Sequence, residues 1–515
     1  MSNPVDSIPK DPASLEALVL SQRSQIEYLK LLVAKLQRQQ FGRRAEAHPA
    51  SPDQIHLTLH GQDQDQESNG APLRLSPEAN SERRRPSRNP LPAHLPRDIH
   101  LHGINDEAGC PRCGGDLRRI GEDVAEMLEF IPARFRVIRH VRPKLACACC
   151  ATLVQAEAPE RPIARGIAGP GLLAHVLVSK YCDHLPLYRQ SQIYAREGVE
   201  LPSSTLSDWV RQSSQLLRPL VEALRRQTLA GGTVHADDTP VPVLAPGRGR
   251  TKTGRLWTYV RDERPAGSGT PPSVWFAYSP DRKGIRPQTH LAGFQGTIHA
   301  DGYAGFNRLF DGTRLEAGCW AHVRRKFYDI HQAQDSPLAA TALDYIQALY
   351  RVEEQVRGKP PDERRQVRQA RAGPVLDALK QWLQMTLARV SRKSELAKAI
   401  HYTLGRWQAL IRYSDDGELE IDNNAAERAL RGVALGRKNY LFAGSDRGGE
   451  WAAALYSLIG TARLNGLDPQ AYLAHVLERI GNHPINRVAE LLPWHVSDQL
   501  RAARAESVPP QRSAA

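Results

Sequence analysis

Two pairs of cysteines constrain what this chain can fold into more than any other feature of its sequence. Cys110 and Cys113 form one CxxC pair, Cys147 and Cys150 form a second, and the segment between them is rich in β-branched residues. Two such pairs can place four thiolates tetrahedrally around one Zn²⁺ ion. The pattern therefore predicts a structural zinc site in a zinc ribbon over residues 99–160, with redox-active or unpaired thiols as the alternative.

The remaining cysteines and the start of the chain bear on its compartment. Cys149 is a surplus thiol that could replace one ligand of the second pair, whereas Cys182 and Cys319 stand alone. A secreted disulfide scaffold would spread its cysteines through a short chain. Residues 1–10 also lack the apolar segment of a signal peptide. We therefore expect a cytoplasmic protein whose thiols stay reduced.

The charge balance narrows the choice of partner. Lys and Arg number 69 against 56 Asp and Glu, and this net charge of +13 favours nucleic acid or a membrane surface. The hydrophobic fraction of 41% is ordinary for a soluble globular protein with a sizeable core. No segment approaches the ~18 apolar residues of a membrane span, so the sequence excludes an integral membrane protein.

The N-terminal hundred residues divide into a heptad segment and a polar segment. The heptad positions of residues 15–36 are Leu15, Val19, Gln22, Ile26, Leu29, Val33 and Leu36. They predict a parallel two-stranded coiled coil within residues 1–45 that would join copies of the chain, with an amphipathic helix on its own core as the alternative. Residues 46–98 have too few apolar residues to offset the ordering entropy, so we expect a disordered linker. Its basic run at 83–88 is either solvated or a phosphate-binding arm.

Residues 161–228 carry helical patterns. Helices are predicted over 171–180, 188–197 and 204–225, with Gly198 between the second and the third. A short turn between two helices is typical of a helix-turn-helix, in which residues 204–212 would be the recognition helix with Ser204 and Arg211 on DNA. A generic helix pair would look the same.

From residue 230 the pattern changes to strands. Strands are predicted over 233–236, 256–261, 273–279 and 296–300. A strongly helical stretch, 335–414, and a final helix-rich block, 422–481, follow them. We therefore expect a multidomain α/β protein with a core split into residues 229–334 and 415–481, a helical insertion at 335–414 and a tail at 482–515.

Three acidic residues stand out by context. Asp237 and Asp301 each close a predicted strand in the sequence His-Ala-Asp, and the proline after Asp237 is expected to end strand pairing there. Glu427 lies on a predicted helix, 423–435, where Asn423 and Arg431 share its face. Carboxylates at adjacent strand ends converge on one crevice and could hold divalent cations. On spacing alone, solvated carboxylates remain the simpler interpretation.

Read in order, the chain resembles the transposases of the insertion sequence 66 family along nearly its whole length. Besides the two cysteine pairs, the matching stretches are residues 40–44, 91–97, 180–190, 236–240, 301–305, 319–327 and 422–442. Asp238 departs from the family pattern, which usually has Glu there, and Cys149 is an additional cysteine.

The resemblance implies a fold and a chemistry. Asp237, Asp301 and Glu427 would be the DDE triad of a ribonuclease-H-like core, binding Mg²⁺ or Mn²⁺ for two-metal phosphoryl transfer. Attack by water would nick the DNA at the end of the transposon, and the freed 3′-OH would then attack target DNA. The 126 residues between Asp301 and Glu427 are too many for one connection, which the helical insertion explains.

The implied partners are DNA and further copies of the chain. The candidate phosphate contacts are Arg324, Arg325, Lys326, Arg431, Arg437 and Lys438, with a solvated surface cation as the alternative for each. His322 is expected near the active site, and a second zinc site at Cys319 and His322 is disfavoured because no partner pair is evident. A bacterial, nucleoid-associated protein is implied, with accessory proteins of the same element as further partners.

Two rival functions come from other classes. A non-catalytic zinc-finger regulator would explain the charge and residues 1–226, but it would leave the three acids without a purpose. A ribonuclease-H-like nuclease that cuts without strand transfer would use the same triad, so the sequence does not separate it from a transposase.

Overall fold

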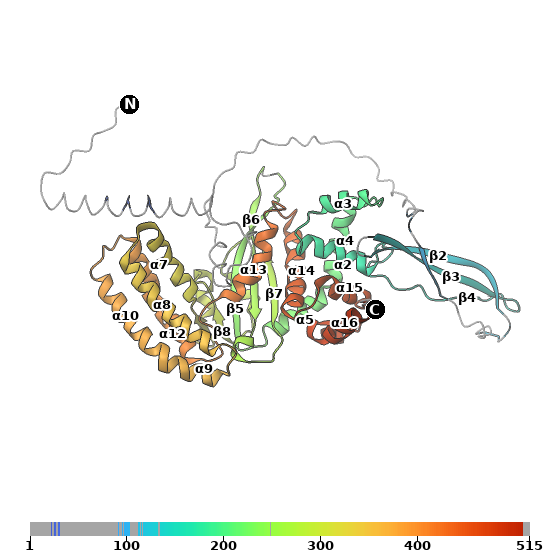
Figure 1. The fold of residues 1–515 in the computed structure, drawn as a ribbon. Helices are drawn as coiled ribbons and strands as arrows, with labels where there is room; N and C mark the ends of the chain where they lie inside the picture. Colours follow the sequence, from blue (N-terminus) through green and yellow to red (C-terminus); the bar gives the residue numbers. More distant parts are fainter. Residues whose placement is uncertain are drawn as a thin grey trace, which may run out of the picture.

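The computed structural model describes residues 22, 25, 26, 29, 30, 91, 95, 97–102, 112, 113, 115, 117–131, 134–247 and 249–507 (Figure 1). The predicted coiled coil and linker therefore lie almost wholly outside the described residues. The five described positions of the heptad segment are helical, and Ile26 and Leu29 are about half exposed. Among the described helices, none has both the length and the apolar composition needed to span a membrane.

The smaller sheet, here called the arm, extends away from the rest of the molecule (Figure 1). It consists of β1 (Arg97–Leu101), β2 (Leu117–Ile131), β3 (Arg134–Cys147) and β4 (Leu153–Gln155). β2 and β3 pair antiparallel over their whole length, while β1 and β4 both pair with β3. Phe135 and Val137, near the hairpin turn, are buried in the main core, so the arm is anchored at that end and its cysteines lie at the other.

The larger sheet has the strand order β7-β6-β5-β8-β9. Its strands are β5 (Thr233–Val243), β6 (Lys252–Arg261), β7 (Ser273–Ser279), β8 (Gly296–His299) and β9 (Arg314–Ala317). β5, β6 and β7 pair antiparallel, whereas β8 and β9 continue the sheet in parallel with β5. The chain is thus a mixed α/β protein, and the prediction for residues 273–279 is confirmed with the same bounds.

The prediction that Asp237 ends its strand is wrong. β5 continues through Pro240 and Pro242 and pairs with β6 as far as Val243. The carbonyl of Pro240 accepts from Arg437 and that of Pro242 from the Ala443 amide, so both point away from β6. The nitrogen and carbonyl of one strand residue point to the same side, and the missing N–H groups therefore face an edge where β8 no longer pairs.

One hydrophobic core joins the sheet to helices from both ends of the described chain. These are α2 (Pro170–Tyr181), α3 (Leu187–Arg196), α4 (Ser203–Leu216), α5 (Arg218–Thr228), α13 (Asn424–Gly436), α14 (Asp446–Leu464), α15 (Pro469–Arg479) and α16 (Pro493–Ser507). α14 packs on β7, and α15 packs on α2. Residues 485–507, in the segment expected as a tail, form a 3-10 helix (Ile485–Leu491) and α16, with Leu492 and Val496 in this core.

The single helix predicted over residues 204–225 is instead two helices, α4 and α5, which meet at Leu217. Pro219 lies in the first turn of α5. A proline there lacks the amide that would continue α4, and its ring would clash with the carbonyl four residues earlier.

The opposite face of the sheet is covered by α6 (Ile285–His290) and a 3-10 helix (Ala304–Leu309), which bury Trp257 and Tyr259. A separate helical body, here called the insertion, lies on the far side of the sheet from the arm (Figure 1). It consists of α7 (Trp320–Gln334), α8 (Pro337–Val356), α9 (Pro361–Val367), a π-helical turn (Arg368–Ala372), α10 (Gly373–Leu387), α11 (Glu395–Gly405) and α12 (Trp407–Asp415). Its hydrophobic core includes residues from Ala317 to Ile421. The chain enters the insertion near Cys319 and leaves it near Asn423, and these two residues are in contact.

Candidate active site

The register of two parallel strands aligns Asp237 with Asp301. In the β5–β8 pair, Thr233 lies opposite Thr297 and His235 opposite His299, a separation of 64 residues in each case. The same 64 residues separate Asp237 from Asp301. Each aspartate therefore lies two residues after the last residue of its strand that pairs in the β5–β8 ladder. The two His-Ala-Asp motifs are thus side by side in this register.

The histidines of the two motifs stack on each other. The rings of His235 and His299 lie 4.3 Å apart between centroids at an angle of 14°. Both are buried, and burial lowers the pKa of each ring, well below its usual range for His299. Neutral imidazoles are thus the stable form here, and the two rings, each two residues before an aspartate, add no positive charge.

Asn423 fixes the start of α13 against β5. Its side-chain oxygen lies 3.1 Å from Nδ1 of His235, and its amide nitrogen donates to the Ala236 carbonyl at 2.9 Å. Its backbone amide also donates to Sγ of Cys319 at 3.2 Å. These bonds hold the start of α13, whose first turn carries Glu427, against the part of β5 that carries Asp237.

The carboxyl groups of Asp237, Asp301 and Glu427 form one cluster, here called the acid site, in which the pKa values of Asp237 and Glu427 are raised. Burial and the charges of Asp301, Asp238 and Glu427 hold the pKa of Asp237 well above its usual range. Burial raises the pKa of Glu427 to about 7, against the opposing charge of Arg325. Asp237 is 2% exposed and Glu427 3%, whereas Asp301 is partly buried.

A divalent cation fits this arrangement. Oδ2 of Asp237 is buried and has no hydrogen-bond partner among the described residues. Burying an ionised carboxylate without a partner is costly, and a cation removes most of that cost. Oxygen donors are also the ligands that Mg²⁺ and Mn²⁺ prefer.

Asp238 has a different environment from its neighbour. Successive strand residues point to opposite faces, and Asp238 lies on the face of Trp257, where its carboxylate meets Arg255 at 3.2 Å and Arg282 at 3.0 Å. Burial raises its pKa, and the two guanidinium groups oppose this shift. Asp238 is thus neutralised by the protein itself.

His322 lies next to the acid site, on α7. Its Nε2 is 3.8 Å from Oε1 of Glu427. Cys319, at the start of the same helix, completes a group in which one ligand atom from each of Cys319, His322 and Glu427 lies within 4.8 Å of the others. The sequence disfavours a zinc site at the CxxH motif because no second pair of ligands follows it. The contact with Glu427, which lies 105 residues after His322, has no local sequence signal.

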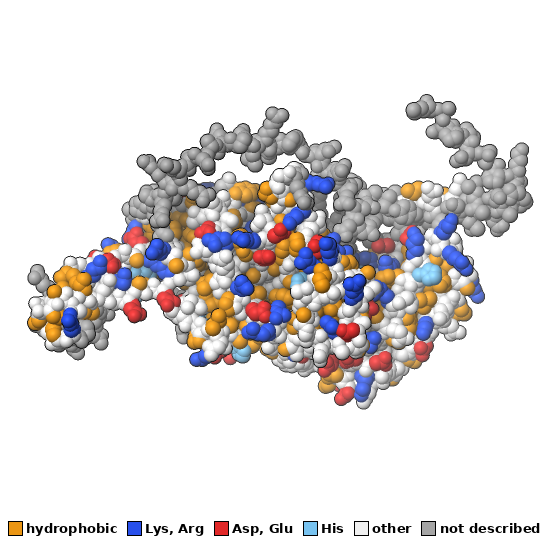
Figure 2. Space-filling model, turned by 180° about the vertical axis from the view of Figure 1, so that it is seen from behind, with side chains coloured by type: hydrophobic (Ala, Val, Ile, Leu, Met, Phe, Trp, Pro, Cys, Tyr) orange, Lys and Arg blue, Asp and Glu red, His pale blue; other side chains and the backbone are white. Residues whose placement is uncertain are grey.

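The cations predicted to contact phosphate have different environments. Arg437 is partly buried and donates to the Pro240 carbonyl at 2.7 Å, which secures the edge of β5. Arg324 lies over the ring of Tyr328, and Lys326 over that of Tyr402. Arg325 and Arg431 are partly buried, whereas Lys438 is exposed. The face shown in Figure 2 carries Lys and Arg from the arm to the insertion, with Asp and Glu between them.

The predicted recognition helix is α4. Ser204 is exposed in its first turn, and Arg211 forms an ion pair of 2.6 Å with Asp208 on the same helix. Gly198, between α3 and α4, has φ of 81°, a conformation that only glycine adopts without strain.

The cysteines of the second pair meet Cys113 at the distal end of the arm. Sγ of Cys113 lies 3.5 Å from the sulfurs of both Cys147 and Cys150, whereas Cys110 lies outside the described residues. A hydrogen bond from the Cys150 backbone amide lowers the pKa of Cys147. Three close sulfurs and a thiolate-favouring amide fit a zinc ion. Cys149 is exposed and stands outside this sulfur cluster of Cys113, Cys147 and Cys150.

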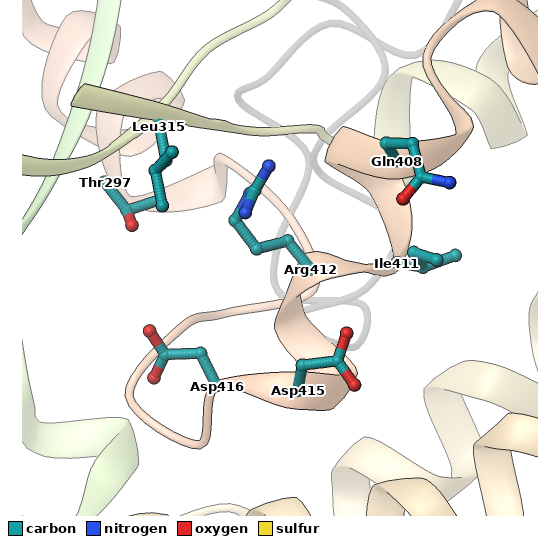
Figure 3. Close-up of a pocket in the computed structure, with 7 residues that line it drawn as sticks. All are labelled: Thr297, Leu315, Gln408, Ile411, Arg412, Asp415 and Asp416. Carbon is teal, nitrogen blue, oxygen red and sulfur yellow. The ribbon is translucent and has the colours of Figure 1, made fainter. Parts of the chain in front are cut away.

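A separate pocket opens beside the sheet edge, between β9 and α12 (Figure 3). It has a volume of about 240 Å³, and its lining residues are Thr297, Leu315, Gln408, Ile411, Arg412, Asp415 and Asp416. Thr297 belongs to the beginning of β8, whereas Asp301 follows its end. The residues of the acid site do not line this pocket.

Most of the described chain matches models of known protein families. Residues 165–451 match the model of "Transposase IS66 family", residues 107–151 that of "zinc-finger binding domain of transposase IS66", and residues 457–494 that of "IS66 C-terminal element". Residues 28–99 match "Transposase C of IS166 homeodomain". The zinc-finger match and the sulfur cluster together support a structural zinc.

Similar proteins occur in Sinorhizobium fredii. Uncharacterized protein y4hP is 40% identical over 489 residues, covering 90% of this chain and 88% of the relative. Uncharacterized protein y4jD is 38% identical over 511 residues, covering 95% and 97% of the two chains. The similarity therefore extends over nearly the whole length of both relatives.

Proposed function

The chain belongs to the IS66 transposase family, and on this premise we propose that it cleaves DNA at the terminal repeats of its element and joins the freed ends to target DNA. The observation that carries the proposal is the shared 64-residue register, which aligns Asp237 with Asp301, two carboxylates whose neighbourhood also includes the charge of Glu427. A solvated surface carboxylate would need neither this alignment nor the clamp that Asn423 provides.

We propose that the larger sheet is a ribonuclease-H-like core. Three antiparallel strands followed by two parallel ones, with β5 central, support this interpretation. The insertion then occupies the connection between the second aspartate and the glutamate, and it returns the chain to the sheet at Asn423.

Asp237, Asp301 and Glu427 would hold Mg²⁺ or Mn²⁺. Such cations, when bound, supply Lewis-acid activation of the attacking oxygen and stabilisation of the departing one. The carboxylates must lose their protons to bind them, and Arg325 favours the ionised form of Glu427. Arg324, Lys326 and Lys438 would contact the phosphates.

DNA binding and assembly are proposed for the N-terminal half. The zinc-bearing arm and the helix pair α3–α4, with Ser204 and Arg211, would contact the terminal repeat. Residues 15–36 would join two or more copies, since two element ends must be held together. Deleting residues 1–45 should then reduce the oligomer size in sedimentation, and an unchanged oligomer would assign the contacts elsewhere. A bacterial cytoplasmic, nucleoid-associated setting with accessory proteins of the element would follow.

A joining assay separates this function from its rivals. Labelled terminal-repeat DNA and a target plasmid are incubated with the protein and Mg²⁺, and the products are resolved by size. Joined products support a transposase. Cleavage without joining would favour a nuclease, and binding without cleavage would favour a regulator.

A further inference from the structure

Two helices that are distant in sequence begin at the same place beside the sheet. Cys319 is the N-cap residue of α7 and His322 lies in its first turn, while Glu427 lies in the first turn of α13. Their ligand atoms all lie within 4.8 Å of one another, and His322 Nε2 is 3.8 Å from Glu427 Oε1. Cys319 is 3% exposed, so its sulfur faces the other two residues from inside the protein.

The donor atoms of this mixed cluster are sulfur, nitrogen and oxygen. Mg²⁺ prefers oxygen ligands in an octahedron. One thiolate, one imidazole and one carboxylate instead suit a borderline-soft cation that accepts four ligands in a tetrahedron. Three protein ligands would leave a fourth position for water.

We propose that Cys319, His322 and Glu427 bind a thiophilic divalent cation, namely Zn²⁺, at a site distinct from the zinc of the arm. The surroundings of the sulfur support this assignment. The backbone amide of Asn423 donates to Sγ of Cys319, and the same residue is fixed to β5 by two further hydrogen bonds. Outer contacts of this kind hold a ligand in position before the cation arrives.

The site shares Glu427 with the acid site, and this has a regulatory consequence. A zinc ion that draws Glu427 toward Cys319 and His322 removes a ligand from the proposed catalytic cations. Zinc should therefore inhibit Mg²⁺-dependent cleavage. Inhibition rests on the proposed function, whereas zinc binding at the mixed cluster does not.

Zinc counting tests the binding site without any activity measurement. The full chain is saturated with Zn²⁺, freed of loose metal by gel filtration and analysed for zinc per chain. Wild type should hold one zinc more than Cys319→Ser and one more than His322→Gln. Cys182→Ser removes another lone, half-buried cysteine and should match wild type. Because only the difference is used, the result does not depend on whether the arm holds its zinc.

Equal zinc content in wild type, Cys319→Ser and His322→Gln would overturn the site, as would a loss shared by Cys182→Ser. Circular dichroism checks that each variant is folded, and if Cys319→Ser is not, the His322→Gln comparison decides. In the cleavage assay, the zinc concentration for half-inhibition should rise at least about tenfold in Cys319→Ser, measured against that variant's own zinc-free rate. Equal inhibition would remove the regulatory role and leave the zinc count standing.

Discussion

The distal end of the arm and the centre of the larger sheet both gather side chains that we propose as metal ligands, but the two groups differ in how far they are enclosed. At the arm, Cys147 is buried but Cys113 is exposed, and the sulfur cluster lies at the end of a hairpin that enters the main core only near its turn. At the sheet, Asp237 and Glu427 are almost fully buried between a strand and a helix that Asn423 ties together.

This difference shows two ways in which a cation can matter. Among the described residues, the sulfurs of the arm lie outside the main hydrophobic core, so a zinc ion there would supply folding free energy directly. The acid site is already shaped by hydrogen bonds, and its buried carboxylates oppose one another until a cation arrives. Removing ligands should therefore unfold the first region locally, whereas it should inactivate the second and stabilise it.

The largest effect is expected at the arm. Cys147→Ser removes one sulfur of the cluster, and structural zinc sites of this kind are worth about 10 kcal/mol or more. Amides of residues 117–147 should lose protection from hydrogen exchange, while those of the larger sheet keep theirs. Cys149→Ser, in the same turn but outside the cluster, is the matched control. A zinc-free variant with a fully protected arm would contradict a structural role.

The acid site should respond in activity. Asp237→Asn keeps the size but removes one charge, so cleavage should fall at least about a thousandfold, equivalent to about 4 kcal/mol of barrier. Asp238→Asn removes the carboxylate that faces Arg255 and Arg282, so it should lower stability by about 3 kcal/mol and cost much less cleavage when assayed below its melting temperature. The reverse pattern would move the catalytic centre to the other face of the sheet.

Glu427 should link stability to pH. Its folded-state pKa of about 7 exceeds the usual value of 4.5, so the stabilising neutral form is fully present below about pH 4.5 and is lost as the pH rises through 7. Glu427→Gln should therefore be more stable than wild type at pH 8 without Mg²⁺, by up to about 3 kcal/mol, and nearly equal at pH 5. Thermal melting at both pH values measures this. If the stability difference between Glu427→Gln and wild type is the same at both pH values, Glu427 is already ionised at pH 5.

The smallest effect is expected at Asn423, whose side chain ties the start of α13 to β5. Asn423→Ala removes two side-chain hydrogen bonds, worth about 1–3 kcal/mol together. Stability should fall by this amount and cleavage by about tenfold, because Glu427 is less well positioned. Asn439→Ala alters an exposed asparagine beyond α13 and should change neither. Full activity of Asn423→Ala would show that packing alone positions α13.

Local patterns predicted much of the fold. β7 has the predicted bounds, and α2 and α3 begin within one residue of their predicted starts, because alternation and helical periodicity reflect the burial of nearby side chains. The end of β5 and the single helix over residues 204–225 were predicted wrongly, because the effect of a proline depends on its tertiary environment. At Pro240 the missing amide faces an unpaired edge, so the strand continues, whereas at Pro219 it falls where a helix would otherwise have continued.

The candidate site was predictable only in part. The two His-Ala-Asp motifs carry a visible repeat, so the sequence indicated Asp237 and Asp301 as a pair. The contact of Asn423 with His235 spans 188 residues and that with Cys319 spans 104, and no local pattern encodes either. The structural role of Arg437 was missed for the same reason, since its partner is a backbone carbonyl 197 residues earlier.

The two prolines of β5 also bear on how the chain is made. The segment that covers their edge, from Arg437 to Ala443, leaves the ribosome nearly two hundred residues after the strand itself. At about 5–20 residues per second, the edge stays open for roughly 10–40 s of synthesis. An open strand edge invites pairing with neighbouring nascent chains, but Pro240 and Pro242 offer no amide hydrogen to such a strand. The sheet is thus guarded against misassembly while the rest of the protein is still being translated.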